Sequence, residues 1–239
     1  PKGLLRKLNL VVGGVMWVLV GAAVVFAISQ PEPGTGSWDM SSAVTRSGVL
    51  VATPYPMLIE DADRGEAAKV TLLVQIGKVG AQELVGQRDR AFADVTGFAI
   101  QRDHRRIMEL DVLGGEPIAE SANRETIGLP EITLVGGGVQ LAGEIMDSKC
   151  YLGAMKPGHG MGHRACAQLC IRGGIPPMLV VRNEDGRRAY LVLVDQQRKA
   201  IEPEAIVEHV GVPVSVTGDL YRFGDLLMLS VDPAAVRAM

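Results

Sequence analysis

The chain has 239 residues and a formal net charge of −3, with acidic and basic residues interspersed. No extended basic surface is implied, so nucleic acid is not an expected partner. Only 4% of the residues are aromatic, whereas glycine (29) and proline (13) are frequent. This composition favours many short strands and turns over a helical bundle.

An apolar stretch lies near the N-terminus. No charged residue occurs between Lys7 and Glu32, and Leu10 to Ile28 is nearly all apolar. At about 1.5 Å rise per residue this stretch covers roughly 28 Å, close to the hydrocarbon thickness of a bilayer. It exceeds the usual apolar region of a cleaved signal peptide, roughly 7–15 residues, so a retained transmembrane helix is favoured over that alternative.

The charges on either side of the stretch predict its orientation. Lys2, Arg6 and Lys7 precede it, whereas Glu32 and Asp39 follow it. The positive-inside rule then places the N-terminus in the cytoplasm and the C-terminal bulk in the periplasm, as in a single-pass protein of a bacterial inner membrane. The lipid bilayer and other membrane-protein subunits are the expected partners of this helix.

The sequence predicts four segments. Residues 1–29 form the anchor with its short cytoplasmic N-terminus, and residues 30–43 read as an extended linker because proline, glycine and serine abound there. Strand-like runs follow, among them a hairpin with Ala91–Ile100 and Arg106–Leu113 as its arms. We expect residues 44–134 to form a first β-barrel-like domain with its connector, and residues 135–239 to form a second one.

An internal repeat supports that division. Val95-Thr96-Gly97 recurs as Val216-Thr217-Gly218, and at the same offset Ile107-Met108 aligns with Met228-Leu229. Such self-similarity indicates duplication of a small β unit. The final strands, each with glycine after the first, resemble those of an OB-type barrel. The predicted fold is therefore mainly β, with one N-terminal transmembrane helix followed by two small OB-like β-barrels in tandem. A single irregular β-sandwich is the alternative.

One segment of the second domain gathers the chemically active residues: Cys150, His159, His163, Cys166 and Cys170. Arg164–Ile171 predicts a short helix that ends at Gly173-Gly174. Cys166 and Cys170 would share one face of that helix, with His163 one turn earlier.

Several interpretations of this segment remain open. In an oxidising compartment the favoured one is a disulfide from Cys150 to Cys166 or Cys170, which leaves one thiol over. Alternatively, the thiolates and the imidazoles of His159 and His163 suit copper or zinc as metal ligands. A redox-active thiol pair is the third interpretation, although the Cys-x-x-Cys arrangement is missing. A buried set of free thiols with a structural role is the last.

The same segment carries a resemblance to a family of uncharacterised bacterial membrane-anchored periplasmic proteins. The similar residues are Gly143–Cys150 (GEIMDSKC), His163–Ala167 followed by Cys170, Gly173–Pro177 (GGIPP), Pro54-Tyr55-Pro56 and Gly77-Lys78-x-Gly80-Ala81. The resemblance would cover most of the region outside the membrane. It implies location and fold, and it brings no activity with it.

No set of acid, base or nucleophile can be named, so the sequence does not predict an enzyme. The favoured function is a non-enzymatic accessory or stabilising subunit of a membrane-bound electron-transfer complex, respiratory or photosynthetic, exposed on the periplasmic side and without a cofactor of its own. The alternative is a periplasmic metal- or thiol-handling maturation factor that uses the Cys/His segment and binds copper or zinc.

Overall fold

The computed structural model describes residues 2–29, 35–60, 67–121 and 128–239. The chain divides into two compact units, Pro1–Gly34 and Thr35–Met239. The first unit contains helix α1 (Lys2–Ser29). Within it, Gly3–Ser29 is long and apolar enough to cross a membrane, with a mean hydropathy of 2.5. The predicted apolar helix is thus confirmed.

The second unit begins with sheet A, whose strands are β1 (Ser37–Trp38), β2 (Val44–Val51), β3 (Met57–Glu60), β4 (Lys69–Val74), β5 (Phe92–Arg102), β6 (Arg105–Leu110) and β7 (Ile118–Glu120). Five of them follow the order β5-β2-β3-β4-β6, and β5 also pairs with β6, so these strands form a closed barrel. β4 and β6 run parallel. Helix α2 (Gln82–Gly86) stands between β4 and β5 in the chain.

Sheet B contains β8 (Ile132–Asp147), β9 (Pro177–Arg182), β10 (Arg188–Val194), β11 (Pro213–Phe223), β12 (Leu226–Val231) and β13 (Arg237–Ala238). Its path is β11-β8-β9-β10-β12, and β11 also pairs with β12. β10 and β12 run parallel. The short 3-10 turns η2 (Pro203–Ala205) and η3 (Val207–His209) stand between β10 and β11, and η4 (Pro233–Ala235) follows β12. The strands are therefore connected in the same order in both sheets.

Equivalent glycines mark the close approach of strands in each sheet. A Cβ atom on Gly97 of β5 would overlap the carbonyl oxygen of Glu109 on β6, and one on Gly218 of β11 would overlap that of Ser230 on β12. Glycine is the residue that permits such an approach. This contact explains why the two copies of Val-Thr-Gly both end in glycine.

The apolar runs of sheet A are buried on both faces. Leu50 of β2 and Leu73 of β4 belong to a cluster enclosed by sheet A. Their neighbours Val51, Leu72 and Val74 belong to a second cluster that contains most of the core of sheet B. Because successive side chains of a strand point to opposite faces, one face fills the barrel and the other packs against sheet B.

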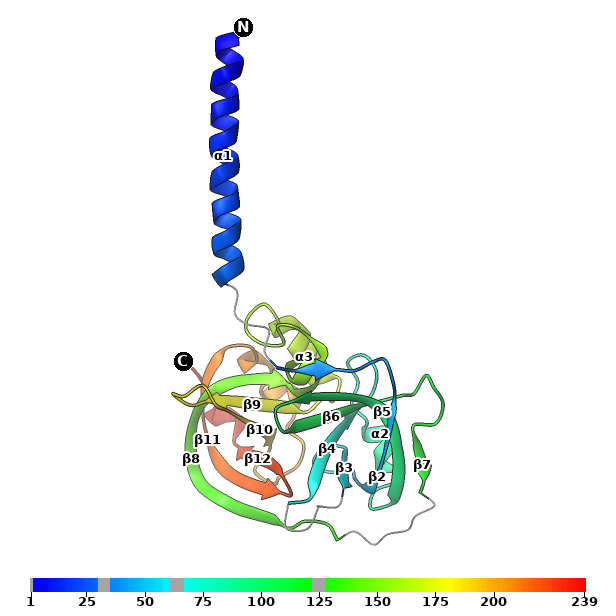
Figure 1. Ribbon diagram of the computed structural model, residues 1–239. Helices are drawn as coiled ribbons and strands as arrows, with labels where there is room; N and C mark the ends of the chain where they lie inside the picture. Colours follow the sequence, from blue (N-terminus) through cyan, green and yellow to red (C-terminus); the bar gives the residue numbers. More distant parts are fainter. Residues whose placement is uncertain (1, 30–34, 61–66, 122–127) are drawn as a thin grey trace. The chain divides into compact units, whose positions relative to one another are not determined.

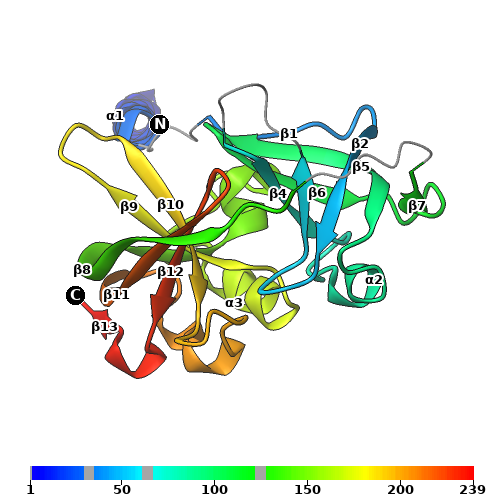
Figure 2. The same ribbon diagram turned by 90° about the horizontal axis from the view of Figure 1, so that it is seen from below.

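Each sheet has a hairpin turn that accepts a hydrogen bond from a strand of the other sheet. Asp225, in the β11–β12 turn, accepts a hydrogen bond from the amide of Val70 on β4 (2.9 Å). Asp103, in the β5–β6 turn, accepts one from the hydroxyl of Tyr190 on β10. β4 and β10 hold the same place in their sheets, so the two contacts are reciprocal. Figures 1 and 2 show the two groups of strands side by side.

Two predicted boundaries differ from the structure. Ser37 and Trp38, in the predicted linker 30–43, pair with Gln101 and Ile100 of β5, because the edge of β5 offers free backbone groups and Trp38 packs against the core. Residues 30–34 of that linker lie outside the described residues. The predicted division between 134 and 135 falls inside β8, and the two predicted domains lie in one compact unit.

Candidate metal centre

The Cys/His segment connects β8 to β9. It contains the π-helical turn η1 (Cys150–Ala154) and helix α3 (Arg164–Arg172). The predicted helix over Arg164–Ile171 is confirmed. Figure 2 shows α3 beside both groups of strands. Cys150 begins η1, whereas Cys166 and Cys170 lie one turn apart on α3.

The structure brings the three cysteines together as free thiols. Cys150 Sγ lies 4.0 Å from Cys170 Sγ, and the sulfur atoms of Cys150, Cys166 and Cys170 all lie within 4.8 Å of one another. We call these three residues the thiol cluster. The predicted disulfide is not formed, since an S–S bond is about 2.05 Å long and these sulfur atoms lie farther apart than that.

A second group of possible ligands shares Cys150 with the thiol cluster. Asp147, Cys150 and His163 also have ligand atoms within 4.8 Å of one another, and all three are buried. The Cys150 amide donates to Asp147 Oδ1 (2.8 Å), and His163 Nε2 lies 3.3 Å from Asp147 Oδ2. The carboxylate therefore positions both the cysteine and the imidazole. The described residues thus offer two adjoining groups that could hold a metal ion.

Lys78 supplies positive charge to the thiol cluster. It lies in the loop after β4 of sheet A, and its ammonium donates to Cys166 Sγ (2.8 Å) and approaches Cys170 Sγ to 3.7 Å. The hydrogen bond to Cys166 raises the pKa of Lys78 above its ordinary value. The ammonium is therefore a stable counter-charge for thiolates.

The pKa values of the two buried thiols, Cys150 and Cys170, are shifted in opposite directions. The hydrogen bond that joins Cys150 to Cys170, together with burial, raises the pKa of Cys150 far above 9.0. The same bond lowers the pKa of Cys170, with the Lys78 charge acting in the same direction and burial opposing both. Cys170 is therefore the more acidic thiol of this pair.

A buried ion pair holds the start of the segment on sheet A. The ammonium of Lys149 pairs with the carboxylate of Glu109 on β6, and both side chains are almost fully buried. Lys149 also donates to the carbonyl oxygens of Gln75 (3.0 Å) and Gly77 (2.8 Å). Because a buried charge without a partner is costly, these contacts determine where Cys150 lies.

The end of the segment is held by backbone contact. The amide of Gly80 donates to the carbonyl of Gly173 (2.7 Å). A Cβ atom on Gly173 would overlap the carbonyl oxygen of Lys78. The segments Gly77–Ala81 and Gly173–Pro177 therefore meet in space, and their contact places Lys78 beside the cysteines of α3.

Not every predicted ligand joins the centre. His159 is in neither group of possible ligands. Its ring lies against that of Tyr151, with centroids 6.2 Å apart, and burial lowers the pKa of His159. His163, in contrast, lies beside Cys150 as a predicted ligand would.

Asp147 and Lys78 are the residues that the sequence did not single out. Asp147 is fully buried at the end of β8. A buried carboxylate is not distinguishable in the sequence from a solvated one at a strand end. Lys78 is 88 residues from Cys166, and only the resemblance over Gly77–Ala81 pointed to that loop.

The chain was compared with protein-family models, with curated proteins and with solved structures, and no match was found.

Proposed function

We propose that this chain is a membrane-anchored protein that binds a thiophilic metal ion, zinc or copper(I), at the thiol cluster and handles it for another protein. The observation that carries this proposal is the gathering of three free sulfur atoms within 4.8 Å of one another. It corresponds to the second function considered from the sequence, a metal-handling maturation factor.

The spacing of the sulfur atoms suits a metal. Zinc–sulfur bonds are about 2.3 Å long, so two thiolates on a tetrahedral ion lie about 3.8 Å apart. The 4.0 Å between Cys150 Sγ and Cys170 Sγ is close to that separation. Asp147 or His163 would complete a tetrahedral zinc site, whereas the three sulfur atoms alone would suit copper(I).

Charge and access also favour a metal. Three thiolates around either ion leave net negative charge, which the Lys78 ammonium beside Cys166 and Cys170 would neutralise. Cys150 and Cys170 are buried, but Cys166 is only partly buried and Lys78 is exposed. One ligand therefore faces solvent, as exchange of the ion with a partner requires.

The proposal includes the location and the fold of the carrier. The apolar helix α1 would anchor the centre to the bacterial inner membrane, with Thr35–Met239 in the periplasm as the charge bias predicts. Sheets A and B would be two copies of one OB-like barrel. Their shared strand order, with parallel pairs β4–β6 and β10–β12, supports this duplication.

Metal binding is tested with the full chain in a neutral detergent. The thiols are first reduced and counted under anaerobic conditions. The protein is then equilibrated with zinc or copper(I), freed of excess metal and analysed for metal per chain. We expect one ion per chain, and Cys150→Ser, Cys166→Ser and Cys170→Ser should each lower this ratio severalfold.

The matched control is His159→Ala, which lies in the same segment but outside both ligand groups and should retain the ion. Circular dichroism of the metal-free variants shows whether each one folds. Metal-free protein with three titratable thiols after equilibration would overturn the proposal. So would a Cys166→Ser variant that keeps the ion in full.

A second candidate function is the accessory subunit of a membrane-bound electron-transfer complex. The exposed apolar side chains of Ile132, Leu134 and Val135 at the start of β8 favour it, since such a patch fits a protein partner. Gentle extraction from native membranes, followed by a native gel and mass spectrometry, tests it. Stoichiometric migration with a large cytochrome- or pigment-containing assembly supports this candidate, and migration of the chain alone contradicts it.

A further inference from the structure

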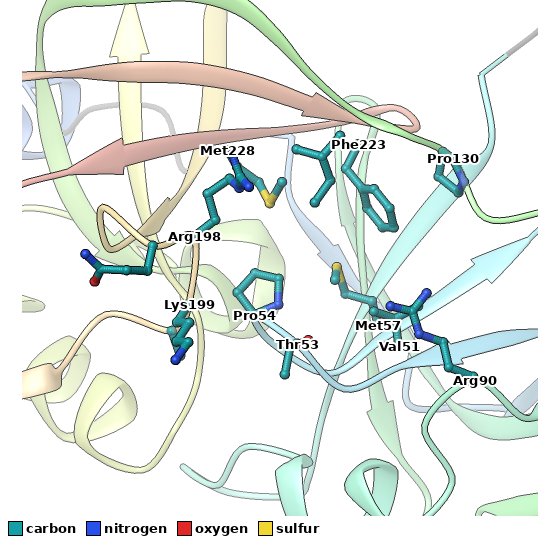
Figure 3. A pocket seen from close by; sticks show the side chains of 13 residues that line it. Val51, Thr53, Pro54, Met57, Arg90, Pro130, Arg198, Lys199, Phe223 and Met228 are labelled. Carbon is teal, nitrogen blue, oxygen red and sulfur yellow. The ribbon is translucent and has the colours of Figure 1, made fainter.

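A cleft of about 600 Å³ lies between sheet A and sheet B, away from the thiol cluster. Figure 3 shows side chains from both sheets around it. The apolar part is formed by Val51 and Met57 of sheet A and by Phe223 and Met228 of sheet B, all of which are buried. The volume falls within the range of small-molecule sites, about 300–1,000 Å³.

The cleft is the counterpart of the thiol cluster in the other half of the unit. Val51 pairs with Met57 in sheet A, and Met146 pairs with Met178 in sheet B. The connection from β2 to β3 in sheet A is 52–56, whereas the equivalent connection from β8 to β9 in sheet B is 148–176, which contains the thiol cluster. The short connection leaves open the space that the long one fills.

The cation beside each site holds an equivalent position. The last residue of β4 forms a bridge to Gly80, and the last residue of β10 forms one to Ala200. Lys78 and Arg198 each precede the bridged residue by the same number of positions. Lys78 reaches the sulfur atoms of the thiol cluster, and Arg198 lines the cleft. Figure 3 shows Arg198 and Lys199 along one side of the cleft, with Arg90 apart from them.

The charged side chains that line the cleft are basic. Among the described residues, its lining contains Arg90, Arg198 and Lys199 and no acidic residue. Within the described residues, Arg90 makes one salt bridge, with its neighbour Asp89 (3.7 Å). Lys199 makes no ion pair with any residue in the described part of the chain. Exposed cations beside a buried apolar surface suit a ligand that has one apolar part and one anionic part.

The turn that presents two of these cations is well ordered by hydrogen bonds. Asp195 Oδ1 accepts from the amides of Gln197 (2.9 Å) and Lys199 (2.8 Å). Arg198 adopts a positive φ of 58°, a conformation that non-glycine residues rarely take. Its guanidinium lies over the ring of Tyr221, 5.2 Å from the centroid. The turn thus holds Arg198 and Lys199 in place before any ligand arrives.

We propose that this cleft binds an amphiphilic oxyanion, with an alkyl chain against Met57, Phe223 and Met228 and a carboxylate or phosphate head at Arg198 and Lys199. Arginine and lysine recognise both head groups through charge-assisted hydrogen bonds. The apolar floor supplies the affinity for the chain. This inference is independent of the metal proposal.

The test uses the full chain in lipid nanodiscs and two photoactivatable probes with the same alkyl chain. One probe carries a carboxylate head and the other a phosphate head. Mass spectrometry locates the labelled residues after illumination. We expect labelling of the peptides around residues 51–57 and 223–228, and the more strongly labelling probe identifies the head group. Inorganic phosphate should not displace either probe.

The decisive variant is the double substitution Arg198→Gln with Lys199→Gln, which changes exposed residues and spares the core. We expect labelling in the cleft to fall about tenfold, as loss of a charged hydrogen bond of roughly 1.5 kcal/mol implies. The control is Arg46→Gln with Arg187→Gln, which removes two cations away from the cleft. Equal labelling of the two double variants would overturn the proposal, and so would labelling confined to other surfaces or displacement by inorganic phosphate.

Discussion

The two halves of the Thr35–Met239 unit differ mainly in one connection, which joins β2 to β3 in sheet A and β8 to β9 in sheet B. In sheet B the connection 148–176 packs on the loop after β4 and brings two cysteines of the thiol cluster, Cys166 and Cys170, against Lys78. In sheet A the connection 52–56 is short, and Arg198 borders an open cleft. The same strand order therefore supports a filled site at one end and an open one at the other. The lesson is that the chemistry of each site depends on its loop, while the strands only position it.

The largest expected effect on stability comes from the buried ion pair between Lys149 and Glu109 at the thiol cluster. In Glu109→Gln the ammonium of Lys149 would lose its carboxylate and keep only the carbonyls of Gln75 and Gly77. We expect the free energy of unfolding to fall by about 4 kcal/mol, measured by urea unfolding. Glu116→Gln, which breaks the exposed pair with Arg88, should cost less than about 0.5 kcal/mol. Equal effects of the two variants would show that the buried pair does not hold the segment.

The close backbone approach at the other end of the segment gives the next largest effect. In Gly173→Ala the new Cβ would overlap the carbonyl oxygen of Lys78, so α3 would have to move away from sheet A. We expect a loss of about 3 kcal/mol of stability and a weaker metal complex. Gly162→Ala lies in the same segment with open space around it and should leave both unchanged. A stable, metal-binding Gly173→Ala variant would contradict the described contact.

Near the cleft, a buried hydroxyl joins the two sheets. Tyr55, in the 52–56 connection, donates to the carbonyl of Leu193 (2.8 Å) and accepts from the amide of Ile201 (3.0 Å). Tyr55→Phe would leave both buried backbone groups without this partner, so we expect a loss of about 2 kcal/mol. Thermal unfolding measures it, with Tyr221→Phe as the control. No change in Tyr55→Phe would indicate that the sheets are held together without this contact.

Lys78 is expected to affect acidity more than stability. Cys170 has a lowered pKa, so its rate of alkylation should rise with pH through a midpoint below 9.0. Lys78→Met removes the positive charge and should move this midpoint upward, whereas Lys156→Met should not. Tandem mass spectrometry of the alkylated peptide separates Cys170 from Cys166. An unchanged midpoint in Lys78→Met would show that the ammonium does not stabilise the thiolate.

The lowered pKa of Cys170 also makes the stability of the fold depend on pH. A lowered pKa means that folding favours the Cys170 thiolate. Its contribution is therefore full above the ordinary pKa of 9.0 and is lost as the pH falls through the lowered value. The metal-free protein should accordingly become less stable on acidification through that range.

Local features of the fold could be predicted from the sequence. The apolar helix follows from the uncharged run before Glu32, and the hairpin of β5 and β6 follows from two apolar runs around the polar turn at Asp103. The recurrence of Val-Thr-Gly predicted the related hairpin β11–β12, because a close strand approach requires glycine in both places. These signals are carried by neighbouring residues, so they are visible in one sequence.

The centre could be predicted only in part. Spacing on α3 placed Cys166 and Cys170 on one face, but the disulfide preference came from the expected compartment and not from geometry. Lys78 and Glu109 lie on other elements, and their contacts with the segment depend on how sheets A and B pack. Such long-range contacts have no local pattern. The position of His159 against Tyr151 is likewise set by the fold of the segment.

X-ray absorption spectroscopy of the metal-loaded full chain tests the central claim most directly, because it reports the atoms bound to the ion. The account predicts metal–sulfur scattering at about 2.3 Å for zinc, with three sulfur neighbours that fall to two in Cys166→Ser. Scattering from nitrogen and oxygen alone, with all three thiols still free, would contradict it.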